Sequence, residues 1–260
     1  MKKLISIDFK SDFGFFRKPD VNKKLNFSYN IIHKPAILGI LGSILGIQGY
    51  QEKGTQPKYY KELNKINVGI SPLNHEKGSF KQIVIKYNNG VGYASKEEGG
   101  ILNLEEATLI KPSYRVYLLL NLENENEEKL YEYLQNGFSE YIPYFGKNEH
   151  YAWWERESFC EYEYEQHEDL NRTIRVKTIF VKEDIVKEHK AKNAIAMIPS
   201  YDVKEDLFMY FERIPKDFNL DSHQYNICDY VFTTFKLKNS IGIGNTLYYL
   251  KKELFYVQLL

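Results

Sequence analysis

Two short stretches carry residue types that could contact a phosphate backbone. The first is Tyr29-Asn30-Ile31-Ile32-His33-Lys34, which comes directly before Pro35. Proline suits the first turn of a helix because its missing N–H would be unpaired there. The free N–H groups and the dipole of a helix N-terminus favour anions, so Tyr29, Lys34 and the upstream Arg17 could contact phosphates. Alternatively, Tyr29 belongs to the core and Lys34 is merely solvated.

The second stretch is Pro143-Tyr144-Phe145-Gly146-Lys147-Asn148-Glu149-His150. A glycine at the end of a strand allows another backbone to approach closely. Lys147 and Asn148 follow this glycine and could donate hydrogen bonds to a ligand at that point. The alternative interpretation is a turn between two domains.

Other patterns of catalytic and metal-binding residues are missing from the sequence. The six histidines lack HxH and HxxxH spacing, and neither CxxC, a P-loop nor GxSxG occurs. We therefore predict no metal and no cofactor. The two cysteines, Cys160 and Cys228, are typical of a protein from the reducing cytoplasm.

The segment that follows Pro35 contains regularly spaced glycines, namely Gly39, Gly42, Gly46 and Gly49. Spacings of three, four and three place them on one face of a helix. Each costs about 1 kcal/mol relative to alanine. The pattern therefore predicts a helix pressed closely against a sheet, another subunit or a nucleic-acid backbone. Its apolar run, 36–47, is shorter than the ~20 residues of a membrane span, and we expect no membrane partner.

The charges are balanced overall but unevenly distributed. The 260 residues include 35 Lys and Arg and 35 Asp and Glu. The net charge is therefore zero, and it gives no electrostatic argument for nucleic-acid binding by the protein as a whole. Residues 1–34 nevertheless carry a net charge of +5 and residues 155–169 one of −6. These segments suggest two faces for two different partners, or else two solvated surfaces. The 22 tyrosines suit sheets, and some could stack on unpaired bases.

Hydrophobic periodicity predicts an α+β protein with two domains, 1–150 and 151–260. In the first, strands over 4–9, 65–71, 114–120 and 138–145 alternate with helices that begin at Pro35 and at residue 124. A polar excursion contains a β-hairpin with strands over 82–86 and 91–95 and a turn at 87–90. Without the excursion, the order is the βαββαβ of ferredoxin-like folds and RNA-recognition modules. The second domain is predicted to be mainly β, with strands over 161–165, 173–181, 207–214, 230–237 and 254–260.

Several motifs, taken in order, resemble the Cas-five family of type I CRISPR effector complexes, and its I-B-like branch in particular. They are Phe16-Arg17-Lys18-Pro19, Tyr29, the glycine helix from Pro35 to Gln48, Pro112-Ser113-Tyr114-Arg115-Val116-Tyr117-Leu118 and Tyr144-Phe145-Gly146-Lys147-Asn148-Glu149. The resemblance spans residues 1–150. The second half of the chain adds little to it.

The resemblance implies a non-catalytic subunit of a cytoplasmic ribonucleoprotein complex, Cascade, in antiviral defence. Such a subunit caps the 5′ handle of the CRISPR RNA and packs against the Cas-seven backbone subunit and the large Cas-eight subunit. Target DNA near the protospacer-adjacent motif would be an indirect partner. The hairpin excursion, about 72–110, would be the family's thumb. The residues expected at the RNA are Arg17, Lys18, Tyr29, His33, Lys34, Gly39, Gly42, Gly146, Lys147 and Asn148.

Two alternatives remain open at this point. One branch of the family cleaves repeat RNA without metal, using a base, an acid and a cation; Tyr29, His33 and Lys34 would then be the catalytic set. A protein of a different class would be a ferredoxin-like protein–protein adaptor without an RNA role. Salt dependence separates RNA binding from the adaptor role, because phosphate contacts weaken steeply as salt rises.

Overall fold

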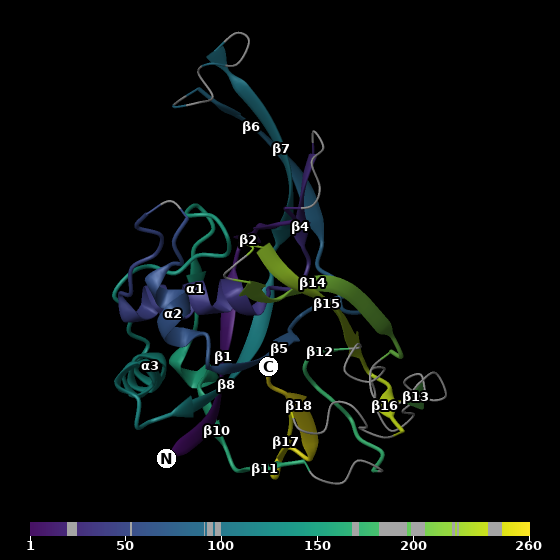
Figure 1. The fold of residues 1–260 in the computed structure, drawn as a ribbon. Helices are drawn as coiled ribbons and strands as arrows, with labels where there is room; N and C mark the ends of the chain where they lie inside the picture. Colours follow the sequence, from purple (N-terminus) through teal and green to yellow (C-terminus); the bar gives the residue numbers. More distant parts are fainter. Residues whose placement is uncertain are drawn as a thin grey trace.

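The protein is described by a computed structural model that covers residues 1–19, 25–52, 54–90, 92, 96, 100–167, 172–181, 197–198, 206–219, 222, 224–238 and 246–260. A central antiparallel sheet organises the first half (Figure 1). Its strands, in spatial order, are β10 (Cys160–Tyr162), β1 (Lys2–Ser11), β8 (Ser113–Asn121) and β5 (Asn67–Pro72). β9 (Ala152–Trp153) extends the pairing along β1.

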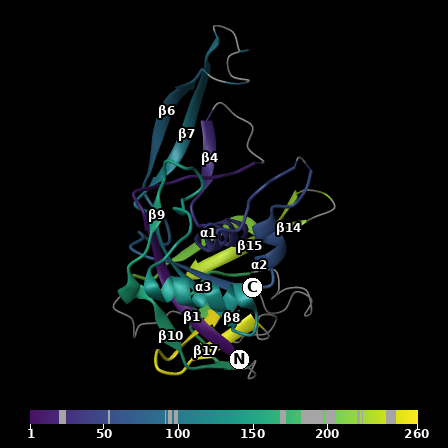
Figure 2. The same ribbon diagram turned by 90° about the vertical axis from the view of Figure 1, so that its left-hand side faces the viewer.

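Helices cover one face of this sheet (Figures 1 and 2). They are α1 (Lys34–Leu45), α2 (Lys58–Leu63) and α3 (Glu125–Asn136). α1 and α3 bury their apolar side chains against alternate residues of the central strands, including Ile5, Ile7 and Leu118. The element order β1-α1-β5-β8-α3-β10, with β10 beside β1, is ferredoxin-like and agrees with the predicted fold class.

The mainly β second half covers the other face. Leu4, Tyr117 and Leu119 point away from the helices and pack against Leu250 and Val257. These two residues belong to β17 (Leu247–Leu250) and β18 (Phe255–Gln258), which form a three-stranded sheet with β11 (Tyr164–Gln166). The central strands are therefore apolar on both faces, which explains the nearly continuous apolar run at the end of β8.

A long strand pair, β14 (Met209–Asn219) with β15 (Gln224–Thr233), lies beside α1. β12 (Phe180–Val181) pairs with β15, and β13 (Met197–Ile198) pairs with β16 (Lys236–Leu237). Glu212 of β14 reaches the segment before α1. Its carboxylate accepts hydrogen bonds from the backbone N–H groups of Asn30 at 2.9 Å and Ile31 at 3.0 Å. The second half therefore fixes the segment that leads into the glycine helix.

The polar excursion forms a hairpin that projects from the body, here called the thumb (Figure 1). Its strands are β6 (Gln82–Asn89) and β7 (Leu102–Ile110). The base of β7 also pairs with β2 (Phe13–Gly14) and, in parallel, with β4 (Leu25–Tyr29). β4 in turn pairs with β3 (Phe16–Arg17). The segment predicted as an extended basic loop is therefore tied to the thumb by short strands.

Two local predictions differ from the structure, and a third concerns residues that lie almost wholly outside the described part of the chain. Residues 87–89, predicted as a turn, lie in β6, because Asn89 pairs with Leu102. Except for residue 92, the strand predicted over 91–95 lies outside the described residues. No strand forms over 138–145, where Tyr144 makes a single bridge to Tyr151. β10 takes the closing position, because its residues pair with Leu4, Ile5 and Ser6.

Candidate functional site

A groove of about 870 Å³ opens between α1, strand β3 and the 141–147 segment. Five of the residues expected at the RNA line it: Arg17, His33, Gly39, Gly146 and Lys147. Lys18, Tyr29, Lys34, Gly42 and Asn148 do not line it. The stretches 29–34 and 143–150 thus meet at one cavity, although only some of their residues face it.

Lys147 stands where the groove meets the thumb. Its Nζ donates to Oε2 of Glu106 at 2.8 Å and to the Tyr87 hydroxyl at 3.2 Å. It also lies 4.4 Å from the centroid of the Tyr87 ring. Burial lowers the pKa of Lys147, but the hydrogen bonds to Glu106 and Tyr87 outweigh this effect and the net pKa is raised. Lys147 is therefore a fixed cation at the groove.

Gly146 lets the chain turn at a point where a side chain has no room. Its φ is +84°, in the left-handed region, and a Cβ there would lie 1.9 Å from the backbone oxygen of Phe15. The backbone N–H of Phe15 also donates to the carbonyl of Phe145 at 3.1 Å. The turn is thus docked on the strand that leads to Arg17. Only glycine satisfies both the φ angle and this contact.

Arg17 and Lys18 are adjacent in sequence but face different surroundings. Arg17 is exposed and lines the groove. The Lys18 ammonium lies 3.2 Å from Oε1 of Glu212 and 5.1 Å from the centroid of the Tyr29 ring. Lys18 thus serves the contact between the two halves of the chain. Asn148 is exposed just outside the groove.

Tyr29 and His33 belong mainly to the core. Tyr29 is 2% exposed, and His33 is 6% exposed with its ring centroid 5.6 Å from that of Tyr29. His33 caps α1: its Nδ1 accepts a hydrogen bond from the N–H of Ala36 at 3.2 Å. Burial lowers the pKa of His33 to about 3. The side chain is consequently neutral at physiological pH and supplies no positive charge to a phosphate.

Lys34 points away from the groove. Its Nζ donates to the backbone oxygen of Leu260 at 2.8 Å. Burial lowers the pKa of Lys34 to about 8, with Lys216 adding to the effect and Asp217 opposing it. Tyr29, His33 and Lys34 therefore do not converge on one open point, although they lie close together in sequence.

The face of α1 that carries Gly39 and Gly42 packs against a neighbouring helix, α2. A Cβ on Gly42 would lie 2.5 Å from Cβ of Tyr59 in α2, and one on Gly39 would lie 3.7 Å from the Tyr59 ring. Gly46 ends the helix with a φ of +74°. These contacts come from α2, a helix of the same chain that periodicity did not predict.

Three aromatic side chains at the mouth of the groove were not among the residues expected at the RNA. Tyr50 is 65% exposed, Tyr141 61% and Tyr144 43%, and all three line the cavity. Exposed aromatic faces beside cations are the means by which proteins hold unpaired bases. Among 22 tyrosines, only the arrangement in space distinguishes these three.

Among the described residues, no three His, Cys, Asp or Glu side chains gather as a metal site. In the same part of the chain, no helix is long and apolar enough to span a membrane.

Comparison with known proteins gives structural neighbours only. No family model matches the sequence, and no curated protein matches it. A CRISPR protein from Archaeoglobus fulgidus has a TM-score of 0.49 and 14% identity, over 99% of this chain and 98% of that one. A chain of a CRISPR RNA-guided surveillance complex has a TM-score of 0.46 and 8% identity, over 90% of each chain.

A functionally uncharacterized protein from Streptococcus mutans has a TM-score of 0.31 and 13% identity. The alignment covers 60% of this chain and 66% of that protein, so this chain spans about two thirds of its length. The structural neighbours thus include CRISPR-associated proteins at low sequence identity.

Proposed function

We propose that this chain is a non-catalytic RNA-binding subunit of a type I CRISPR surveillance complex and holds the 5′ handle of the CRISPR RNA in the groove beside α1. The observation that carries the proposal is the lining of that groove. Arg17 and Lys147 supply positive charge, and three exposed tyrosines, Tyr50, Tyr141 and Tyr144, supply stacking faces. The order of the Cas-five-like motifs along the sequence supports the assignment to this family.

The lining favours an unpaired strand over a duplex. Stacking on tyrosine requires a base whose face is free, and such contacts tolerate many base sequences. Arg17 can contact a phosphate with two donors, whereas Lys147 acts as a point charge. In this role the thumb stands next to the RNA, because Lys147 bonds to Glu106 of β7. The Cas-seven and Cas-eight subunits would be the neighbouring proteins in the complex.

The metal-independent nuclease is the weaker alternative on geometry. It requires a base, an acid and a cation around one phosphate. His33 instead caps α1 through Nδ1, and Lys34 donates to Leu260. The adaptor role has no specific observation in its favour.

The test uses the purified chain and single-stranded repeat RNA that carries the handle, in EDTA, with one gel read for both shift and cleavage. A scrambled RNA of equal length is the control for sequence. Shift without cleavage, weakened in an Arg17→Gln, Lys147→Gln double variant, is the expected result. Site-specific cleavage that is lost in Tyr29→Phe would favour the nuclease instead. Failure to bind, even after co-expression with the neighbouring genes, would leave the adaptor role.

A further inference from the structure

A second cleft, of about 660 Å³, lies between the end of β5, residues 175–177 and the β14–β15 pair. It shares no lining residue with the groove beside α1. Its volume lies within the range of small-molecule sites, about 300–1,000 Å³. The described part of the chain thus holds two separate cavities of ligand size.

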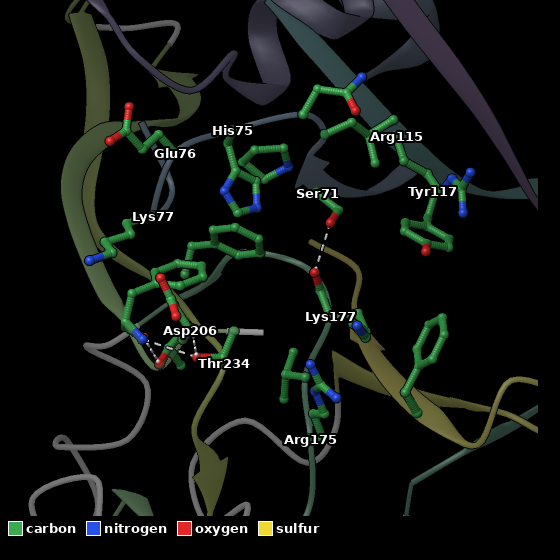
Figure 3. Close-up of a pocket in the computed structure, with 18 residues that line it drawn as sticks. Ser71, His75, Glu76, Lys77, Arg115, Tyr117, Arg175, Lys177, Asp206 and Thr234 are labelled. Carbon is green, nitrogen blue, oxygen red and sulfur yellow. Dashed lines mark hydrogen bonds between the residues drawn. The ribbon is translucent and has the colours of Figure 1, made fainter. Parts of the chain in front are cut away.

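Basic side chains outnumber acidic ones in this cleft. Lys77, Arg115, Arg175 and Lys177 line it, against Glu76 and Asp206. In Figure 3, Glu76 and Lys77 lie at the left of the view, whereas Arg175 and Lys177 lie lower and nearer its centre. Glu76, Lys77 and Asp206 are exposed, whereas Arg115, Arg175 and Lys177 are half-buried. The inner part of the cleft is therefore its more basic part.

The basic wall is held in place by contacts to the central sheet. The guanidinium of Arg115 donates to both carboxylate oxygens of Asp8, at 2.7 and 2.8 Å. The hydroxyl of Ser71 donates to the backbone oxygen of Lys177 at 2.9 Å, a bond drawn in Figure 3. These bonds fix the guanidinium of Arg115 and the backbone at Lys177, so this part of the wall is ordered before a ligand binds.

Aromatic rings complete the lining. Phe208, Phe232, Phe255 and Tyr117 face the cleft, and Phe208 and Phe255 are only partly buried. The Lys177 ammonium lies 5.9 Å from the centroid of the Phe255 ring. A partly open ring beside an ammonium group offers a flat apolar surface next to a positive charge, and this combination fits a flat base that carries a phosphate.

We propose that this cleft binds a nucleotide 5′-phosphate, with the phosphate at Arg175 and Lys177 and the base against Phe255. The ligand is either a free mononucleotide or the terminal nucleotide of a strand. Arginine and lysine donate charge-assisted hydrogen bonds to phosphate oxygens. The inference goes beyond the proposed function, because it concerns a different cavity and holds whether or not the groove binds RNA.

The experiment measures binding to the full chain by calorimetry with four probes: AMP, adenosine, a 5′-phosphorylated tetraribonucleotide and a glutamate-rich peptide. Lys177→Gln removes the ammonium, and Phe255→Leu removes the ring but keeps an apolar side chain. Lys65→Gln removes a similar charge at an exposed residue that lines neither cavity. Melting curves verify that each variant folds.

We expect AMP to bind at least about tenfold more tightly than adenosine. We also expect Lys177→Gln to lower the affinity for AMP by about tenfold. Phe255→Leu should lower the affinities for AMP and for adenosine by the same factor. Lys65→Gln and Lys147→Gln should leave AMP binding unchanged. If only the tetranucleotide binds, with the same dependence on Lys177, the site takes a strand end. Binding of the peptide but neither nucleotide probe would overturn the proposal. Nucleotide binding indifferent to both Lys177 and Phe255 would also overturn it.

Discussion

The ammonium of Lys147 lies 2.8 Å from Oε2 of Glu106, so the turn after residue 144 is joined to strand β7 of the thumb. Any phosphate that enters the groove meets a cation that already has a carboxylate partner. The ion pair therefore opposes RNA binding while it fixes the position of the lysine.

Glu106→Gln should strengthen RNA binding. The neutral amide leaves the charge of Lys147 available to a phosphate, and we expect affinity to rise by roughly threefold or more. The slope of log affinity against log salt should steepen by about 0.7, the value for one further phosphate on a single strand. Glu105→Gln is the matched control, because Glu105 is the neighbouring residue on β7 and pairs with Lys86. Equal effects of the two variants would contradict this account of Lys147.

The exposed tyrosines of the groove should contribute stacking energy. Tyr141→Ala and Tyr144→Ala are each expected to weaken the binding of single-stranded RNA by about 1–3 kcal/mol. Tyr151→Ala is the control, because Tyr151 is 62% exposed but does not line the groove. Fluorescence anisotropy with single-stranded and duplex RNA of the same sequence measures the effect. Equal losses for both RNAs would argue against stacking.

Gly146→Ala should destabilise the fold. A Cβ at this position meets the Phe15 carbonyl oxygen at 1.9 Å, and the φ of +84° is strained for alanine. We expect the free energy of unfolding in urea to fall by about 2 kcal/mol or more. Gly49→Ala provides the comparison, since nothing lies within 4 Å of a Cβ there. A Gly146→Ala protein as stable as wild type would show that the turn can move off Phe15.

Burial of His33 should make stability fall in acid. The pKa of His33 is about 3 in the folded chain against 6.5 for an exposed histidine. The unfolded chain thus takes up a proton below pH 6.5 while the folded chain does not. Stability contributed by this residue is fully present above pH 6.5 and declines, by about 1.4 kcal/mol per pH unit, until pH 3.

His33→Asn tests this assignment, because asparagine can cap the helix but does not titrate. Urea unfolding at several pH values between 3 and 7 should give a shallower acid decline for the variant than for wild type. Parallel declines would mean that His33 is not responsible.

Local periodicity was sufficient to predict the central elements. Alternation gave β1, a nearly continuous apolar run gave β8, and Pro35 and Asn124 correctly marked the starts of α1 and α3. The closing strand was misplaced because its identity depends on pairing with Leu4 to Ser6, more than 150 residues away in sequence. Helix α2 has only six residues, too few for a periodic signal, so the partner of Gly42 could not be predicted.

The site was predicted only in part for a similar reason. Gly146 and Lys147, which line the groove, could be named from the sequence because a glycine next to a cation is a local signal. Burial of His33 and the direction of Lys34 result from packing against distant segments, such as Tyr225 and Leu260. The tyrosines at the groove were missed because most tyrosines of this chain serve sheets and core. The division into domains at residue 150 stays a prediction.

The bonds from Asn30 and Ile31 to Glu212 have a consequence for the newly made protein. The acceptor is encoded 182 residues after Asn30. At about 5–20 residues per second, a ribosome needs roughly 10–35 s to supply it. During that interval β14 has not yet been synthesised and does not cover the apolar residues before α1. A chaperone could bind these residues. The groove therefore acquires its final support late in translation, after both stretches that line it have left the ribosome.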